Sequence, residues 1–148
     1  MAADLVFLDT NILVYANVAS APLHQAAITA IQNLWDSGNE LWISHQVLRE
    51  FLVTVTRPQT FAAPQPISIV LARVRYFQTQ FKIAEDSSEV MNKLLALLVQ
   101  IPTSGKQVYD ANIVATMQAY GISYLLTHNT SDFNRFTSLI TVSPLVQL

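Results

Sequence analysis

Short apolar runs alternate along the chain with longer segments whose apolar residues recur at helical spacing. The short runs have the length and apolar continuity of buried strands, and the longer segments have the period of amphipathic helices. Strands that alternate with helices predict an α/β fold, in which a short parallel sheet is flanked by helices on both faces. The predicted strands are residues 5–8, 40–43, 82–84, 122–126 and 140–142.

The helix boundaries are predicted from residues that stabilise helix ends. Ser44 is predicted to cap the helix that follows it, and Thr10 or Asn11 the first short helix. Asp86 and Glu89 look like an acidic variant of the capping box. The predicted helices are one that ends near residue 16, then residues 22–36, 45–56, 67–77, 86–100 and 108–120, with a helical turn at 131–136.

Composition narrows the class of protein. The 148 residues fit a single domain with a sizeable core, so we expect one domain over residues 1–148. The apolar stretches are too short to cross a bilayer, and the start of the chain lacks the features of a signal peptide. There is no cysteine, so thiolate metal sites and disulfides are excluded. The simplest expectation is a cytoplasmic protein with no membrane association.

The charge of the chain is low. Charged residues make up 12% of the sequence, against a usual share of about 25%. A small domain with so little charge is expected to cover part of its apolar surface with a partner or with its own copy. The net charge is −2, so no overall positive field indicates nucleic-acid binding.

Four acidic residues lie in apolar surroundings, where an unpaired charge is expensive to bury. They are Asp9, Glu50, Asp110 and Asp132. Asp9 directly follows the first predicted strand, and Asp132 follows the fourth. In open α/β sheets ligands bind beyond the carboxyl ends of the strands, so all four acids can converge on that edge.

A shared acidic site predicts a particular chemistry. Converging carboxylates repel one another unless cations neutralise them, and oxygen ligands without His or Cys favour Mg²⁺ or Mn²⁺. Such ions commonly act on phosphodiesters by activating water and stabilising the developing negative charge. Taken singly, each acid could instead be a helix cap, a solvated helix residue or a partner of a helix dipole. We favour the joint site, because the single-residue explanations must be correct for all four acids independently. They also do not account for the apolar residues on either side of each acid.

Several sequence motifs are similar to those of a known family. The order and spacing of four segments resemble the PIN domain, a fold of metal-dependent ribonucleases: residues 8–13 (LDTNIL), 49–51 (REF), 109–115 (YDANIVA) and 127–133 (THNTSDF). Three further segments look most like the VapC-type toxins of prokaryotic toxin–antitoxin pairs: residues 55–58 (VTRP), 132–136 (DFNRF) and 144–145 (PL).

The resemblance implies a function and a set of site residues. It implies Mg²⁺- or Mn²⁺-dependent endonucleolytic cleavage of RNA that leaves a 5′-phosphate and a 3′-hydroxyl, a homodimer, and inhibition by a small antitoxin protein. The acids that would hold the metal and its water are Asp9, Glu50, Asp110 and Asp132. The residues that would support them by hydrogen bonds are Thr10, Asn11, Thr127 and Asn129.

Contacts with RNA are harder to predict, because phosphate binding usually requires a basic path. Only Arg49, Lys106 and Arg135 lie near the motifs in the sequence. An ion pair or a solvated position explains each of them equally well. A groove formed between two copies of the chain would bring the basic residues of both copies together.

Two other functions fit an α/β domain of this size. A phospho-accepting receiver requires paired acids after the first strand and a lysine after a late strand, whereas this chain has Asp9 alone and Thr127-His128. The more serious alternative is a non-catalytic PIN-like scaffold that binds RNA or protein. The presence of acids at all four motif positions argues against it.

Overall fold

A five-stranded sheet forms the centre of the protein in the computed structural model, which describes residues 4–146. Every pair of neighbouring strands is parallel, in the order β3-β2-β1-β4-β5. The predicted parallel sheet is therefore confirmed. The strands are β1 (Leu5–Leu8), β2 (Glu40–Ser44), β3 (Lys82–Ala84), β4 (Tyr124–Thr127) and β5 (Thr141–Pro144).

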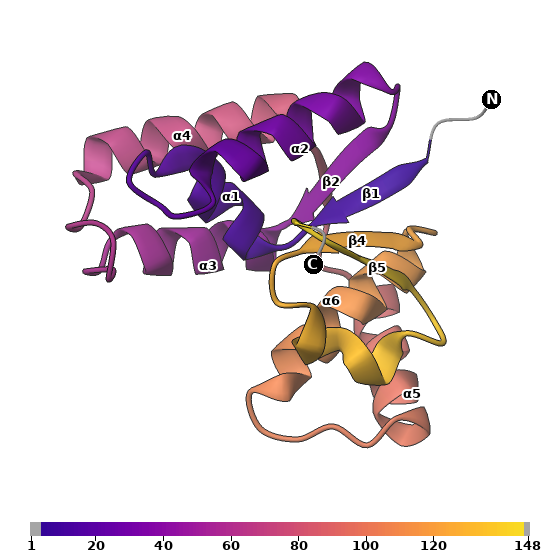
Figure 1. The fold of residues 1–148 in the computed structure, drawn as a ribbon. Coiled ribbons are helices and arrows are strands. Elements are labelled where there is room, and N and C mark those ends of the chain that lie inside the picture. The colour runs from indigo at the N-terminus through magenta and orange to yellow at the C-terminus, as the bar shows by residue number, and fades with distance from the viewer. Residues whose placement is uncertain (1–3, 147–148) are drawn as a thin grey trace.

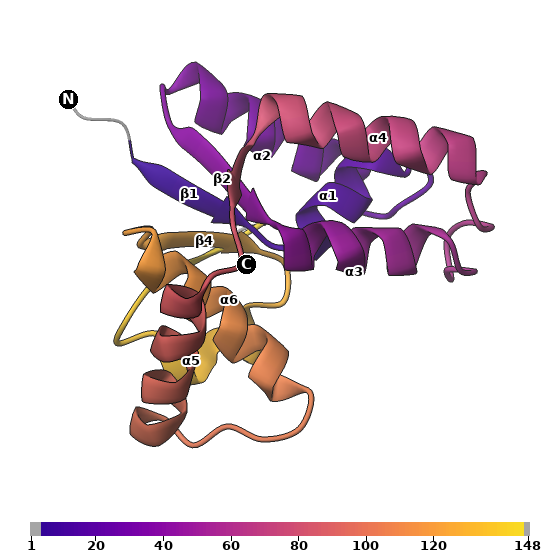
Figure 2. The ribbon, with the colours of Figure 1, turned by 180° about the vertical axis from the view of Figure 1, so that it is seen from behind.

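Helices cover both faces of this sheet, as the alternating pattern predicted. Figures 1 and 2 show α1 to α4 gathered on one side, and α5, α6 and η1 on the other. Within residues 4–146 no helix is both long and apolar enough to cross a membrane. The helices are α1 (Thr10–Asn17), α2 (His24–Asp36), α3 (His45–Val55), α4 (Ile67–Gln80), α5 (Ser88–Gln100) and α6 (Gln107–Ala119), with the short 3₁₀ helix η1 (Thr130–Phe136).

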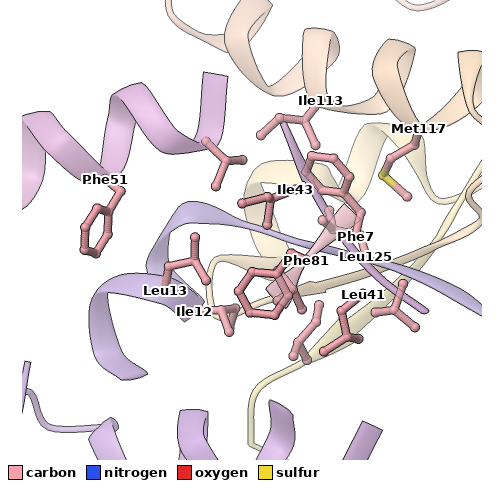
Figure 3. Packing of buried hydrophobic residues seen from close by; sticks show 14 of the residues in the cluster. Phe7, Ile12, Leu13, Leu41, Ile43, Phe51, Phe81, Ile113, Met117 and Leu125 are labelled. Carbon is pink, nitrogen blue, oxygen red and sulfur yellow. The ribbon is translucent and has the colours of Figure 1, made fainter. Parts of the chain in front are cut away.

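The core lies on both faces of the central strand β1. Phe7 is fully buried there, between the neighbouring strands β2 and β4. Figure 3 shows residues of both helical layers around it, including Leu13 of α1 and Ile113 of α6. A strand that is buried on both faces is expected to read as a continuous apolar run, which explains the sequence of residues 5–8.

The strand order places a topological switch between β1 and β4. From β1 the chain moves to β2 on one side, whereas β4 pairs on the other side. Such a reversal opens a crevice beyond the carboxyl ends of the two strands, where ligands bind in α/β proteins. The N–H of Asp9 donates to the carbonyl of Leu126 at 3.1 Å and extends the pairing of the two strands to this edge.

The structure confirms one predicted helix cap and corrects another. Ser44 caps α3, because its hydroxyl accepts a hydrogen bond from the N–H of Val47 at 3.3 Å. The prediction that Thr10 or Asn11 caps α1 was wrong. Asp9 is the cap, and its carboxylate accepts from the N–H of Thr10 at 2.8 Å.

The predicted start of α5 was also wrong. Asp86 was expected to open this helix with Glu89, but Ser87 is the capping residue and the helix begins at Ser88. The backbone of Ser87 is extended, so its hydroxyl reaches the N–H of Val90 at 3.2 Å. Glu89 remains in the first turn, where its negative charge interacts favourably with the helix dipole.

The cap at Ser87 gives a test of this correction. Ser87→Ala is expected to lower the free energy of unfolding by about 1 kcal/mol, because one N–H at the helix start loses its partner. Asp86→Ala is the matched control and should cost less than about half of that. Urea denaturation of the two variants measures both values, and a larger loss for Asp86→Ala would contradict the assignment.

Candidate active site

The four predicted acids line a single groove of about 930 Å³ at the carboxyl edge of the sheet. Each comes from a different part of the fold: Asp9 follows β1, Glu50 lies on α3, Asp110 lies in the first turn of α6, and Asp132 belongs to η1. The expectation that they converge is therefore met, although they are far apart in the sequence.

Asp9 is the most deeply held of these acids, with 7% of its surface exposed. One carboxylate oxygen accepts from the N–H of Thr10 at 2.8 Å. The other accepts from the hydroxyl of Thr127 at 2.8 Å and from the amide of Asn11 at 3.1 Å. Burial raises the pKa of Asp9 above its usual range, even though these hydrogen bonds lower it.

Thr127 and Asn11 also tie the end of β4 to α1. Thr127 is fully buried, and its hydroxyl accepts from the Asn11 amide at 3.2 Å and from the N–H of Asn129 at 3.0 Å. With the bond that it donates to Asp9, this hydroxyl uses its one hydrogen and both lone pairs. The amide oxygen of Asn11 accepts from the N–H of His128 at 2.9 Å. Asn129 lines the groove and contacts Thr127 through its backbone.

Glu50 is held from two sides. The hydroxyl of Thr10 donates to one carboxylate oxygen at 2.7 Å, and the amide of Gln46 donates to the other at 2.9 Å. Gln46 also donates to the carbonyl of Tyr109 at 3.1 Å and accepts from the amide of Asn112 at 2.7 Å. These bonds join α3 to α6 across the groove and fix the direction of the Glu50 side chain.

Sequence reasoning missed two of these residues, Gln46 and Asn112. Gln46 lies one helical turn before Glu50, so the spacing alone would have placed it on the same face of α3. Asn112 lies within the motif that contains Asp110, but nothing in the sequence indicates that it reaches a different helix. Only the packing of α3 against α6 brings the two amides together.

Asp110 shows that the acids repel one another. Its pKa is raised to about 6, first by burial and then by the negative charges of Asp132, Asp9 and Glu50. The charge of Arg135 acts in the opposite direction. The groove is thus a place where negative charge accumulates, and a bound cation would relieve the repulsion.

The groove fits a hard divalent cation by its chemistry. Its acidic, amide and hydroxyl side chains offer oxygen ligands, and neither His nor Cys lines it. Within residues 4–146, however, no three or more His, Cys, Asp or Glu side chains are grouped so that they could hold an ion by themselves. Unneutralised carboxylates are expected to stay apart. Mg²⁺ needs only one or two of them, since waters and substrate phosphates complete its shell.

The three basic residues singled out from the sequence occupy different positions. Arg49 is exposed and lines the groove. Lys106 precedes α6, and Arg135 in η1 donates to the side chain of Gln107 at 2.8 Å. Neither of these two lines the groove, and a role for any of the three in RNA binding stays a prediction.

The family of this chain follows from a direct comparison. The sequence model of the PIN domain matches residues 6–139, so the chain belongs to the PIN domain family. This confirms the resemblance seen in the motifs. The match covers most of the expected domain of residues 1–148, and the inclusion of both ends in it stays a prediction.

Known proteins resemble this chain in sequence and in fold. It is 27% identical over 145 residues to Ribonuclease VapC33 of Mycobacterium tuberculosis, covering 95% of this chain and 99% of that relative. A toxin–antitoxin complex from Klebsiella pneumoniae matches with a TM-score of 0.66 and 22% identity, over 97% of this chain and 99% of that chain. VapBC2 from Rickettsia felis, bound to a promoter DNA fragment, matches with a TM-score of 0.69 and 21% identity, over 95% and 98%. The resemblance to VapC-type proteins is thereby confirmed.

The repulsion around Asp110 predicts a gain in stability when its charge is removed. In EDTA at neutral pH, Asp110→Asn should raise the free energy of unfolding by on the order of 1 kcal/mol. The pKa shift alone would give more, but Asp110 is partly exposed and its charge is screened by solvent.

The pH dependence of this gain follows from the direction of the shift. The pKa of Asp110 is about 6 in the folded protein and lies near 3.8 when unfolded, so the native protein loses stability as pH rises between these values. The advantage of Asp110→Asn should therefore be absent near pH 4 and complete above pH 6. Urea denaturation across this range measures it, and a variant less stable than wild type at pH 7 would contradict the repulsion.

Proposed function

We propose that this chain is a VapC-type endoribonuclease, the toxin of a toxin–antitoxin pair, and that it hydrolyses RNA with Mg²⁺ or Mn²⁺. The observation that carries the proposal is the convergence of Asp9, Glu50, Asp110 and Asp132 in one groove at the switch point of the sheet. Membership of the PIN domain family supports it, as does the name Ribonuclease VapC33 of a relative that spans the whole chain.

In this proposal the four acids together hold the metal and its coordinated water. When bound, Mg²⁺ or Mn²⁺ activates the attacking water and stabilises the negative charge that develops on the phosphate. Thr127, Asn11 and Thr10 keep the Asp9 carboxylate in one orientation. Gln46 does the same for Glu50, so the ligands are ordered before the substrate arrives.

The reaction is a hydrolysis. The oxygen of water forms a bond to phosphorus, the bond from phosphorus to the 3′-oxygen breaks, and that oxygen takes up a proton. The products are a 5′-phosphate and a 3′-hydroxyl. A bound cation would relieve the repulsion that raises the pKa of Asp110, so this carboxylate would be charged when it holds the metal.

An antitoxin and a second copy of the chain are the proposed partners. The similar Klebsiella protein was solved as a toxin–antitoxin complex. Within residues 4–146 this chain exposes several large apolar side chains that such partners would cover, among them Val53, Ile67, Leu71, Met91, Leu95 and Val99. A toxin that acts on cellular RNA works in the cytoplasm, and we propose that location.

Cleavage of RNA by the purified protein tests the proposal. Wild type with Mg²⁺ or Mn²⁺ should cut total RNA, and EDTA should abolish the activity. Asp110→Asn should lower kcat/KM by roughly a thousandfold, the factor that corresponds to several kcal/mol of lost transition-state stabilisation. Glu89→Gln, an exposed acid that does not line the groove, is the matched control and should cut like wild type.

Two results would contradict the proposal. Cutting that survives both EDTA and Asp110→Asn would mean that the groove is not the active site. Tight RNA binding without cutting of any RNA class, in protein free of antitoxin and loaded with metal, would favour the non-catalytic scaffold.

A further inference from the structure

The groove continues beyond the acids along one face of α3. Glu50, Val53 and Thr54 line it at the spacing of neighbours on a single helix face, and Arg57 lines it from the turn that follows α3. The groove that holds the acids therefore extends past the end of α3.

Arg57, in the turn that follows α3, carries a charge that no acidic side chain within residues 4–146 neutralises. In the part of the chain that the structure describes, the one ion pair within 4 Å joins His45 and Glu85. Arg57 is exposed and lines the groove, so its guanidinium is free to pair with a phosphate. Arg49, which precedes Glu50 in the sequence, is also exposed and also lines the groove.

The connection from α3 to α4 is fixed against its neighbours at this end. The amide of Gln59 donates to the carbonyl of Thr54 at 2.6 Å and so satisfies part of the end of α3. The hydroxyl of Ser20, in the connection between α1 and α2, donates to the carbonyl of Phe61 at 2.6 Å. Figure 1 shows both connections together at the end of α3 that lies away from the sheet. Phe61 is therefore held at a defined position on the groove.

Two aromatic rings line the same groove as Arg57. Phe61 and Tyr15 are both half-buried and both face the groove. Their ring centroids are 6.4 Å apart with an interplanar angle of 62°. Tyr15 also packs edge-to-face on His128, with the centroids 5.6 Å apart. This packing holds Tyr15 in place, so the Phe61 ring has a rigid support.

We propose that Arg57 and Phe61, supported by Tyr15, form a subsite for an unpaired nucleotide of the strand whose phosphate is cut. Arg57 pairs with the backbone phosphate, and the base stacks on Phe61. The inference rests on the proposed ribonuclease function and adds to it the residues that bind one unpaired nucleotide in the groove of the acids. Unpaired bases are the ones that stack on aromatic side chains, whereas bases in a helix are not accessible.

Nucleic acid suits this end of the groove better than a peptide. A strand whose phosphate reaches the acids continues along the same groove, which Arg57 and Phe61 also line. Electrostatic pairing and base stacking are the two contributions that bind single strands. Binding of a peptide alone at Arg57 and Phe61 is the outcome that the experiment must distinguish.

Binding of single-stranded RNA to the non-cutting Asp110→Asn protein tests the subsite. The probe is a short RNA that carries 2-aminopurine, whose fluorescence is quenched by stacking, with Mg²⁺ present. On this background Phe61→Leu should weaken binding by roughly five- to a hundredfold and relieve the quenching, as expected for the loss of one stacked base. Phe61→Tyr keeps an aromatic ring and should retain both, and thermal unfolding checks that each variant is folded.

Arg57→Ala tests the phosphate contact. It should weaken binding and lower the slope of log K against log salt by about 0.7, the value for one phosphate contact on a single strand. Arg73→Ala is the matched control, because Arg73 is exposed on α4 and does not line the groove. It should change neither quantity.

Each outcome supports or overturns a distinct claim. If Phe61→Leu and Arg57→Ala bind RNA as tightly as the parent while wild type still cuts RNA, the subsite is wrong and the ribonuclease function stands. The subsite is equally overturned if the two changes weaken only the binding of an antitoxin peptide. If wild type cuts no RNA and the parent binds none, the proposed function fails together with the subsite.

Discussion

The arrangement of the site depends on the burial of the Asp9 carboxylate at the end of the central strand. A buried carboxylate requires several hydrogen-bond donors, and these come from Thr10, Asn11 and Thr127. The donors fix α1 and the end of β4 around the carboxylate. The hydroxyl of Thr10 then carries the network to Glu50, from where Gln46 connects α3 to α6. The first acid thus organises the elements that supply the others.

Much of the fold could be predicted, because its signals are local. The continuous apolar run of residues 5–8 marks a strand buried on both faces, and Ser44 marks the start of α3. Errors arose where two neighbouring residues could perform the same task, as with Asp86 and Ser87 at α5, where the backbone conformation decides. The strand predicted at Ile122 begins later, because its N–H still bonds to Met117 of α6 at 2.8 Å.

The site could be predicted in part. The acids were found because a charge in an apolar context is unusual, and Thr127 and Asn11 because they belong to motifs of the PIN domain. The roles of Gln46 and Asn112, and the positions of Arg57 and Phe61 on the groove, depend on how helices pack and how a loop is held. No local pattern encodes those relations. The sequence also could not predict how far apart the acids lie. Within residues 4–146 they are not grouped closely enough to hold an ion by themselves, so other ligands must complete the coordination of the cation.

The most direct test of the account is whether the acids bind a divalent cation together. Titration calorimetry with Mn²⁺ should give binding at one locus for wild type, and Asp9→Asn should weaken it by at least tenfold. Near pH 6 the binding should release protons, seen as heats that depend on the buffer, because Asp110 is partly protonated there. Asp36→Asn, an exposed acid on α2, should bind like wild type. Equal Mn²⁺ affinity for Asp9→Asn and wild type would contradict the account.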